Sequence, residues 1–252
     1  MDANKRFRCR RMLCVFVLVL AGGHTSLAFA ADPLRDAIGQ SGDVAPALRQ
    51  LAVLTALSLL PALLIAMTSF TRIVIVLSMV RSALGLQQTP PNAVLITLSL
   101  FLTLFSMMPV LQVAKDRAVD PWLAKTMNTE VAVQTGFQPF KEFMIRQTRE
   151  GDLRAVVSMA GANQPKTLAE VQALHLIPAF MLSELHTAFQ IGFVIFLPFL
   201  LIDLVVAAIL MALGMIMVPP ATVSLPLKIL LFLLINGWVL IAQAILGSYR
   251  QA

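Results

Sequence analysis

The sequence predicts an all-α membrane protein in which two apolar helical hairpins flank a polar helical insert. Of the 252 residues, 58% are hydrophobic and 13% are charged, whereas about a quarter of an ordinary soluble domain is charged. The charges are concentrated in one middle segment, and a short helix-breaking motif occurs once on each side of it. The mean hydropathy of +0.84 is also typical of a membrane protein.

The first 30 residues have the pattern of a cleaved signal peptide. Five cations between residues 5 and 11 precede an apolar run at 12–21, which is too short to span a bilayer comfortably. An A-x-A sequence at 28–30 then predicts cleavage before Ala31. An uncleaved signal anchor is the alternative, and the short apolar run argues against it.

Removing this segment changes the meaning of the net charge of +6. The segment carries five cations and one acid, Asp2, so the remaining chain has a net charge of +2. Nucleic acid as a partner thereby loses its main support. Cys9 and Cys14 are removed as well, so we expect neither a disulfide nor a thiolate metal site.

The charge distribution divides the rest of the chain. Residues 115–170 hold fifteen charges of both signs, whereas 50–113 and 176–249 are almost free of them. The charged residues in those two segments are Arg72, Arg81, Glu184, Asp203 and Lys228. We therefore expect a signal peptide at 1–30, a first apolar helical hairpin region at 31–114, a polar domain at 115–175 and a second apolar helical hairpin region at 176–252.

Four apolar helices of nearly membrane-spanning length are predicted, at 50–68, 93–114, 190–217 and 227–246. The periodicity allows the first to extend to Leu84 and the third to begin near Ile177. If the signal peptide delivers the following chain outside the cell membrane, four crossings make the 115–175 domain extracytoplasmic. Arg72 and Arg81 then lie inside, as the positive-inside rule prefers.

The motif A-L-G-x4-P-P occurs at 83–91 and again at 212–220. Glycine and paired prolines end helices, so each copy predicts a sharp reversal between two helices, unless the repeat is a coincidence of composition. The predicted hairpin-turn residues are Gly85, Pro90, Pro91, Gly214, Pro219 and Pro220.

Signals of catalysis are sparse. After the signal peptide the chain has two histidines, His175 and His186, with no H-E-x-x-H motif and no cluster of metal ligands. We therefore predict that the protein is not an enzyme and has no catalytic, metal-binding or cofactor-binding residue. An intramembrane aspartyl protease, the enzymatic alternative, would need a second acid near Asp203.

Glu184 and Asp203 stand alone in apolar sequence, where an ionised carboxylate costs several kcal/mol unless it is paired or hydrated. They are either proton-relay groups, as in a secondary transporter, or structural acids. We favour the structural interpretation, with Glu184 in a salt bridge between subunits and Asp203 as a buried, hydrogen-bonded acid.

Methionines gather at the end of the third apolar segment, where Met211, Met215 and Met217 precede Pro219. Methionine is flexible and adapts to varied surfaces. Ordinary packing would explain these residues in the middle of a helix. Their position at a helix-breaking turn, beside Gly214, instead indicates a mobile constriction.

Several ordered motifs resemble the FliP family of flagellar type III export-gate proteins. They lie at 67–73 (MTSFTRI), 88–92 (QTPPN), 143–150 (FMIRQTRE), 183–193 (SELHTAFQIGF) and 211–222. The resemblance covers about residues 51–238. It implies a pore-forming subunit of a homo-pentameric ring, assembled with FliQ-like and FliR-like subunits and other export apparatus proteins in the inner membrane, at the flagellar basal body.

The resemblance also implies roles for particular residues. Met215, Ile216 and Met217, with Met211 nearby, match a loop that closes the resting pore as a gasket against the passage of unfolded flagellar proteins. Glu184 matches an acid that pairs with a neighbouring subunit. Ile216 stands where the family commonly has methionine. His186 and Asn236 also depart from the family pattern, so neither is assigned a role. A secondary transporter and a virulence-type secretion homologue remain the alternatives.

We expect the purified protein to begin at Ala31 or close to it, because the A-x-A site follows a short apolar run. N-terminal sequencing of the membrane-extracted protein measures this directly. A chain that still begins at Met1 would contradict the prediction.

Overall fold

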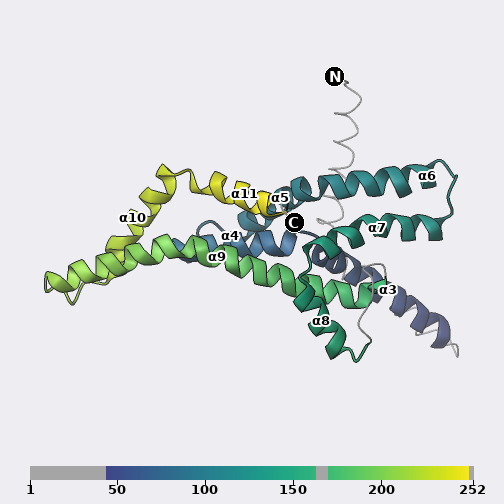
Figure 1. Ribbon diagram of the computed structural model, residues 1–252, viewed down its shortest axis with the longest axis horizontal. Helices are drawn as coiled ribbons and strands as arrows, with labels where there is room; N and C mark the ends of the chain where they lie inside the picture. Colours follow the sequence, from purple (N-terminus) through teal and green to yellow (C-terminus); the bar gives the residue numbers. More distant parts are fainter. Residues whose placement is uncertain (1–43, 163–169, 250–252) are drawn as a thin grey trace, which may run out of the picture. The chain divides into compact units, whose positions relative to one another are not determined.

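The computed structural model describes residues 44–162 and 170–249, and every regular element within those ranges is helical. The all-α prediction is therefore confirmed for this part of the chain (Figure 1). The predicted signal peptide at 1–30 lies outside the described residues. The helices are α3 (Val44–Ala66), α4 (Phe70–Ala83), α5 (Asn92–Ala114), the π-helical η2 (Lys115–Val119), α6 (Asp120–Leu123), α7 (Thr129–Gln147), α8 (Glu150–Met159), α9 (Ala173–Ala212), α10 (Pro220–Leu234) and α11 (Gly237–Ser248).

The chain consists of two units, and the first ends at Leu64. The described part of this unit is α3 as far as Leu64, an apolar helix that contains Pro61. Its exposed apolar residues include Leu48, Leu51, Leu57 and Leu63. The second unit begins at Ile65 and holds all the remaining helices.

Several helices are long and apolar enough to cross a membrane. Within the described residues these are Leu48–Ala66, the continuous stretch Asn92–Leu123 and Ala173–Ala212, and the bent pair α10 and α11 would make a fourth span. The 40 residues of α9 extend over about 60 Å, roughly twice the thickness of a hydrocarbon core. Part of α9 therefore lies outside the hydrocarbon or against other protein.

The prediction of one helix over 227–246 is wrong. The structure has two helices there, α10 and α11, which meet at an angle of 64°. Asn236 adopts a left-handed conformation with φ of 52° between them, a conformation that asparagine tolerates better than most residues. Gly237 follows, and a Cβ there would lie 2.2 Å from the Phe232 ring. The bend therefore depends on two small or permissive residues that hydropathy does not register.

The first predicted helix does not continue to Leu84, because the chain breaks between α3 and α4. The Thr68 hydroxyl donates to the Ile65 carbonyl oxygen at 2.8 Å and accepts from the Phe70 N–H at 3.4 Å. A side chain that bonds to neighbouring backbone groups in this way competes with the helical ladder. The third helix begins at Ala173, earlier than 190 or 177, and ends at Ala212 instead of 217.

Both A-L-G sequences end a helix in the same way. Gly85 and Gly214 have φ of 77° and 75°, the left-handed conformation that glycine adopts without strain. After α4, Leu86 N–H donates to Arg81 O at 3.2 Å; after α9, Met215 N–H donates to Leu210 O at 2.9 Å. These are the six-to-one hydrogen bonds of a Schellman motif.

The prolines of each repeat lie at the start of the next helix. Pro91 is the N-cap of α5, and Pro219 is the N-cap of α10 with Pro220 at the first helical position, where a missing N–H costs nothing. The two repeats therefore occupy equivalent places, at the turns from α4 to α5 and from α9 to α10.

Two hydrophobic clusters form the core of the second unit. The first joins α4, α5, α9, α10 and α11 around Ile73, Leu77 and Phe232. The second joins α5, α7 and the beginning of α9 around Met107, Phe143 and Phe180. Tyr249, at the end of α11, packs against both clusters, so the end of α11 lies where they meet.

The free-energy cost of a left-handed conformation at a residue other than glycine can be measured at Gly214 without clashes with neighbouring side chains. A Cβ at Gly214 or at the helical Gly151 would meet no atom within 4 Å. We expect Gly214→Ala to lower the free energy of unfolding by about 1 kcal/mol, and Gly151→Ala to raise it by up to about 1 kcal/mol. Denaturant titration in detergent measures both changes. Equal effects of the two substitutions would contradict this account of the turn.

Candidate functional site

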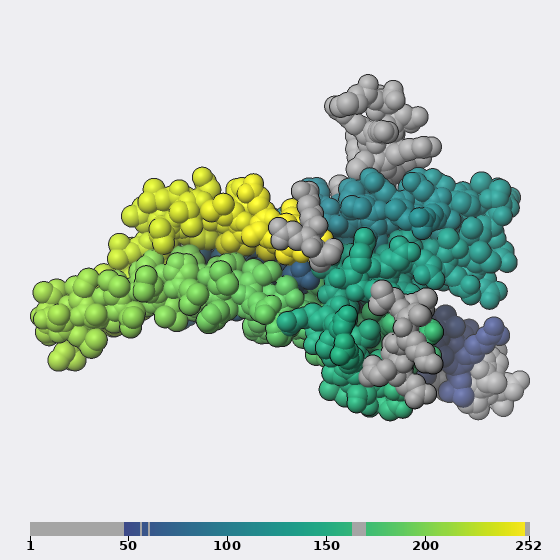
Figure 2. Space-filling model, viewed as in Figure 1, coloured from purple at the N-terminus to yellow at the C-terminus, as the bar shows by residue number. Residues whose placement is uncertain are grey.

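The loop between α9 and α10 exposes apolar side chains at the tip of a helical hairpin. Ile216 and Met217 are 86% and 94% exposed, and Met215 is 45% exposed. Met211, on the last turn of α9, is exposed as well. Figure 2 shows this tip projecting beyond the other described parts of the second unit. An exposed group of large apolar residues of this kind indicates a contact with another molecule.

The backbone of this loop is well defined although its side chains are free. The Schellman bond at Met215 closes its first half, and Val218 N–H donates to Met215 O at 3.3 Å. Pro219 and Pro220 then begin α10. The loop is thus a fixed turn that presents flexible side chains at its tip.

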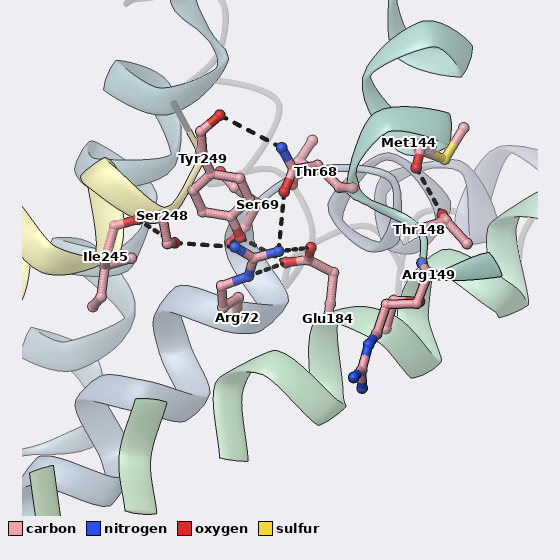
Figure 3. A network of polar contacts seen from close by, with 12 residues as sticks. Thr68, Ser69, Arg72, Met144, Thr148, Arg149, Glu184, Ile245, Ser248 and Tyr249 are labelled. Atoms are coloured by element: carbon pink, nitrogen blue, oxygen red, sulfur yellow. Dashed lines mark hydrogen bonds and ion pairs between the residues drawn. The ribbon is translucent and has the colours of Figure 1, made fainter. Parts of the chain in front are cut away.

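A buried polar network lies at the opposite part of α9, around Arg72 and Glu184 (Figure 3). Arg72 Nε donates to Glu184 Oε2 at 3.0 Å, and Nη2 contacts the other carboxylate oxygen. The remaining guanidinium donors reach Ser248 Oγ at 3.0 Å and Gln147 Oε1 at 3.2 Å. Glu184 is fully buried. The network therefore connects α4, α7, α9 and α11.

Burying two charges is costly unless they are paired in good geometry and their other hydrogen-bonding groups are satisfied. The Arg72–Glu184 pair meets this condition. The planar guanidinium binds both carboxylate oxygens, an arrangement that favours arginine over lysine. The Tyr249 hydroxyl donates a further bond to Glu184 Oε2 at 2.6 Å. Removing one partner would strand the other charge in the interior.

The sequence predicted a neighbouring subunit as the partner of Glu184. The structure places Arg72 of the same chain at Glu184. The intersubunit contact stays a prediction, and the intrachain pair is a contact that sequence reasoning missed.

The residue next to Glu184 connects α9 to α8. Ser183 Oγ donates to Asp152 Oδ2 at 2.6 Å and accepts from the Arg149 N–H at 3.0 Å. Arg149 is the N-cap of α8, where backbone N–H groups lack helical partners. The adjacent residues Ser183 and Glu184 thus hold α9 against both the polar insert and α4.

Lys228 of α10 forms a second tie, nearer the loop. Its Nζ lies 2.6 Å from Asp203 Oδ2 of α9 and donates to the Ala83 carbonyl oxygen at 3.3 Å. Ala83 is the last residue of α4, so a cation meets the negative end of a helix. Lys228 is buried, whereas the Asp203 side chain is 46% exposed. The expectation that Asp203 is a buried acid is therefore wrong for this chain, although its hydrogen bond is present.

The first turn is closed by a different contact. Arg81 Nη1 donates to Asn92 Oδ1 at 2.6 Å and to the Pro90 carbonyl oxygen at 3.2 Å. Gly85 and Pro91 lie at the two ends of this turn. Gln87, Gln88 and Thr89, between them, are exposed. The two turns therefore share the Schellman motif that ends the preceding helix, but one presents polar residues and the other apolar residues.

Comparison with known proteins gives the family. A model described as the FliP family matches residues 53–245. The protein named flagellar biosynthetic protein FliP of Pectobacterium carotovorum subsp. carotovorum is 54% identical over 202 residues, which are 80% of this chain and 77% of that protein. Its namesake in Bacillus subtilis (strain 168) is 47% identical over 82% of this chain and 94% of its own length. That of Aquifex aeolicus (strain VF5) is 42% identical over 93% and 98%.

The chain belongs to the FliP family. The resemblance drawn from its motifs is thereby confirmed. The matched FliP region contains the 215–217 loop, both A-L-G turns, Arg72, Glu184 and Lys228. Ser248 and Tyr249 lie just beyond it, although they complete the Arg72–Glu184 network.

Among the described residues of this FliP-family chain, no group of three or more His, Cys, Asp or Glu side chains could hold a metal ion. His186 is exposed on α9, and no contact assigns it a role.

The missed partners did leave a signal in the sequence. Arg72 and Arg81 are the only charges in 50–113, and Lys228 is the only cation in 176–249. Isolated charges in apolar helices usually pair with one another. Pairing Glu184 and Asp203 with these three cations would have left only a few possible ion pairs. No such signal pointed to Gln147, Ser248 or Tyr249.

We expect Glu184→Ala to lower the free energy of unfolding of the isolated chain in detergent by about 3–5 kcal/mol, because it leaves the buried Arg72 without its counter-ion. Glu150→Ala is the matched control. It removes a carboxylate from the exposed Glu150–Arg154 pair and should cost less than about 1 kcal/mol.

The measurement is denaturant unfolding of the monomeric fraction, followed by sizing of assembled complexes. The double exchange Arg72→Glu with Glu184→Arg should recover part of the loss. If Glu184→Ala leaves the monomer as stable as wild type and abolishes only assembly, Glu184 acts between subunits and not within the chain.

Proposed function

We propose that this FliP-family chain is a pore-forming subunit of the flagellar protein export apparatus. Its relatives carry the name flagellar biosynthetic protein, which favours a flagellar role over a virulence-type one. In the proposed assembly, five copies form a ring in the inner membrane at the flagellar basal body, together with FliQ-like and FliR-like subunits. Unfolded flagellar proteins pass through the ring, and no cofactor takes part.

The observation that carries this proposal is the exposed apolar loop at the tip of the α9–α10 hairpin. Met215, Ile216 and Met217 are held on a fixed turn with their side chains largely free. In a ring, copies of such a loop can meet at the axis and exclude water. Methionine side chains can then deform around passing chains of different sequence. Ile216 is stiffer but keeps an apolar surface.

The outer faces of α9 and α10 are consistent with an assembled or lipid-facing protein. Their exposed large apolar residues include Phe189, Phe193, Leu197, Leu201, Leu204, Leu230 and Leu234. A chain that exposes so much apolar surface needs other subunits or lipid around it. We assign the polar segment 115–175 to the extracytoplasmic side, and the regions 31–114 and 176–252 to hairpins of the ring.

The alternative of a secondary transporter would use Glu184 and Asp203 as a proton relay. Each acid has a cation within hydrogen-bonding distance, Arg72 and Lys228 respectively. Such pairing favours structural roles, because a relay group must exchange protons with its surroundings. The Tyr249 hydroxyl occupies a further site on the Glu184 carboxylate.

Replacing Met215, Ile216 and Met217 together by alanine should open the closed ring to ions. The substitutions shorten side chains that make few contacts within the chain, so assembly should be unaffected. We expect an assembled complex whose conductance in planar bilayers exceeds that of wild type, and slower growth of cells that produce it.

The matched control replaces Val131, Val133 and Met159, which are also exposed apolar residues but lie in the polar insert. This variant should be as tight as wild type. A loop variant that assembles fully and conducts no more than wild type would show that the loop is not the seal.

A further inference from the structure

We propose that the end of α11, Ser248 with the C-cap residue Tyr249, acts as a clasp that locks the Arg72–Glu184 pair. In this proposal α4, α7 and α9 reach their final packing only when the clasp is in place. Synthesis of the chain as far as Tyr249 is thereby coupled to burial of its central ion pair. The inference does not depend on the pore function.

The clasp supplies groups that both charges of the pair require. Ser248 Oγ accepts from Arg72 Nη1 at 3.0 Å, and its own proton goes to the Ile245 carbonyl oxygen at 2.7 Å. The Tyr249 hydroxyl donates to Glu184 Oε2 at 2.6 Å. Without the clasp, one guanidinium donor and one carboxylate lone pair would lose their partners. Unsatisfied groups on a buried charge are among the most costly in a protein.

The Tyr249 ring covers the guanidinium as well. The central carbon of the Arg72 guanidinium lies 3.9 Å from the ring centroid, within the range of a cation–π contact. Phe143 of α7 also stacks against the Tyr249 ring, at a centroid distance of 6.0 Å. Figure 3 shows the ring beside the ion pair. The ring therefore excludes water from the pair while it joins α11 to the polar insert.

The clasp also binds α7 through its backbone. Gln147, the last residue of α7, donates from Nε2 to the Tyr249 carbonyl oxygen at 3.5 Å and accepts from Arg72 Nη2. Tyr249 packs against both hydrophobic clusters. Tyr249 thus contacts both hydrophobic clusters, α7 of the polar insert and the ion pair.

The clasp residues follow both members of the ion pair in the sequence, so they are synthesised after them. Ser248 lies 176 positions after Arg72, and Tyr249 lies 65 after Glu184. All other members of the network are synthesised before the clasp. A chain that ends early therefore contains both charges and lacks the groups that satisfy them, so we infer that it cannot bury the pair stably and leaves α7 and α8 loosely held.

Two truncations test this directly. A chain ending at Gly247 lacks the clasp, whereas a chain ending at Arg250 retains it and serves as the control. Trypsin sites at Lys141, Arg146 and Arg149 report on α7 and its junction with α8. In detergent, we expect cleavage in this region to be roughly tenfold faster for the shorter chain and unchanged for the control. Equal cleavage rates for the two truncations would overturn the proposal.

A milder variant keeps the test decisive if the shorter chain fails to fold. Tyr249→Phe preserves the ring and removes the hydroxyl, and should lower the folding equilibrium constant roughly tenfold. When Tyr249→Phe is combined with Glu184→Gln, the folding equilibrium constant should fall by much less than the product of the two separate fold-changes, because both substitutions affect the same hydrogen bond. When Tyr249→Phe is combined with Asp203→Asn, the two fold-changes should multiply, because Asp203 shares no contact with Tyr249. Multiplicative behaviour in the Glu184 combination would overturn the proposal as well.

Discussion

The buried Arg72–Glu184 pair is the interaction on which the rest of this structure depends. Four helices that are far apart in the sequence supply its partners: α4, α7, α9 and α11. A buried charge pair adds little net stability compared with apolar packing, but each charge imposes a strong penalty on any arrangement that leaves it unpaired. The pair therefore selects one way of packing helices whose apolar faces could pack in many ways.

The two ends of α9 differ in the freedom of their side chains. At Ser183 and Glu184 the helix is fixed by hydrogen bonds to α8, α4 and α11. At its C-terminus it leads into a loop whose apolar side chains are exposed. Lys228 lies between these regions and holds α10 to Asp203 and to the end of α4. A rigid base with a free apolar tip suits the seal that we propose for this loop, because only the tip should move.

Much of the fold could be predicted from the sequence. Apolar runs separated by a charged segment indicated helical hairpins and an insert, and the A-L-G-x4-P-P repeat indicated the positions of the turns. These features are local, since glycine and proline act on the backbone wherever they occur. The exposed loop was also identified, because methionines beside a helix-breaking turn are a local pattern.

The features that were missed depend on local conformations without a hydropathy signal or on contacts between distant residues. The break at Thr68 coincides with a side chain that bonds to the backbone of Ile65 and Phe70, and the bend at Asn236 with a single left-handed residue. The partner of Glu184 lies 112 positions away, and Tyr249 differs from its surroundings in the sequence only as the single tyrosine. Composition and periodicity cannot show which of several cations an acid meets, because that is decided by tertiary packing.

The most direct measurement is a cryo-electron microscopy map of the assembled complex at side-chain resolution, in which the partner of the Glu184 carboxylate can be traced. This account predicts that the carboxylate meets the guanidinium of Arg72 from the same chain, with the Tyr249 ring over that guanidinium. A carboxylate bound to a cation of a neighbouring subunit, with Arg72 directed elsewhere, would contradict it.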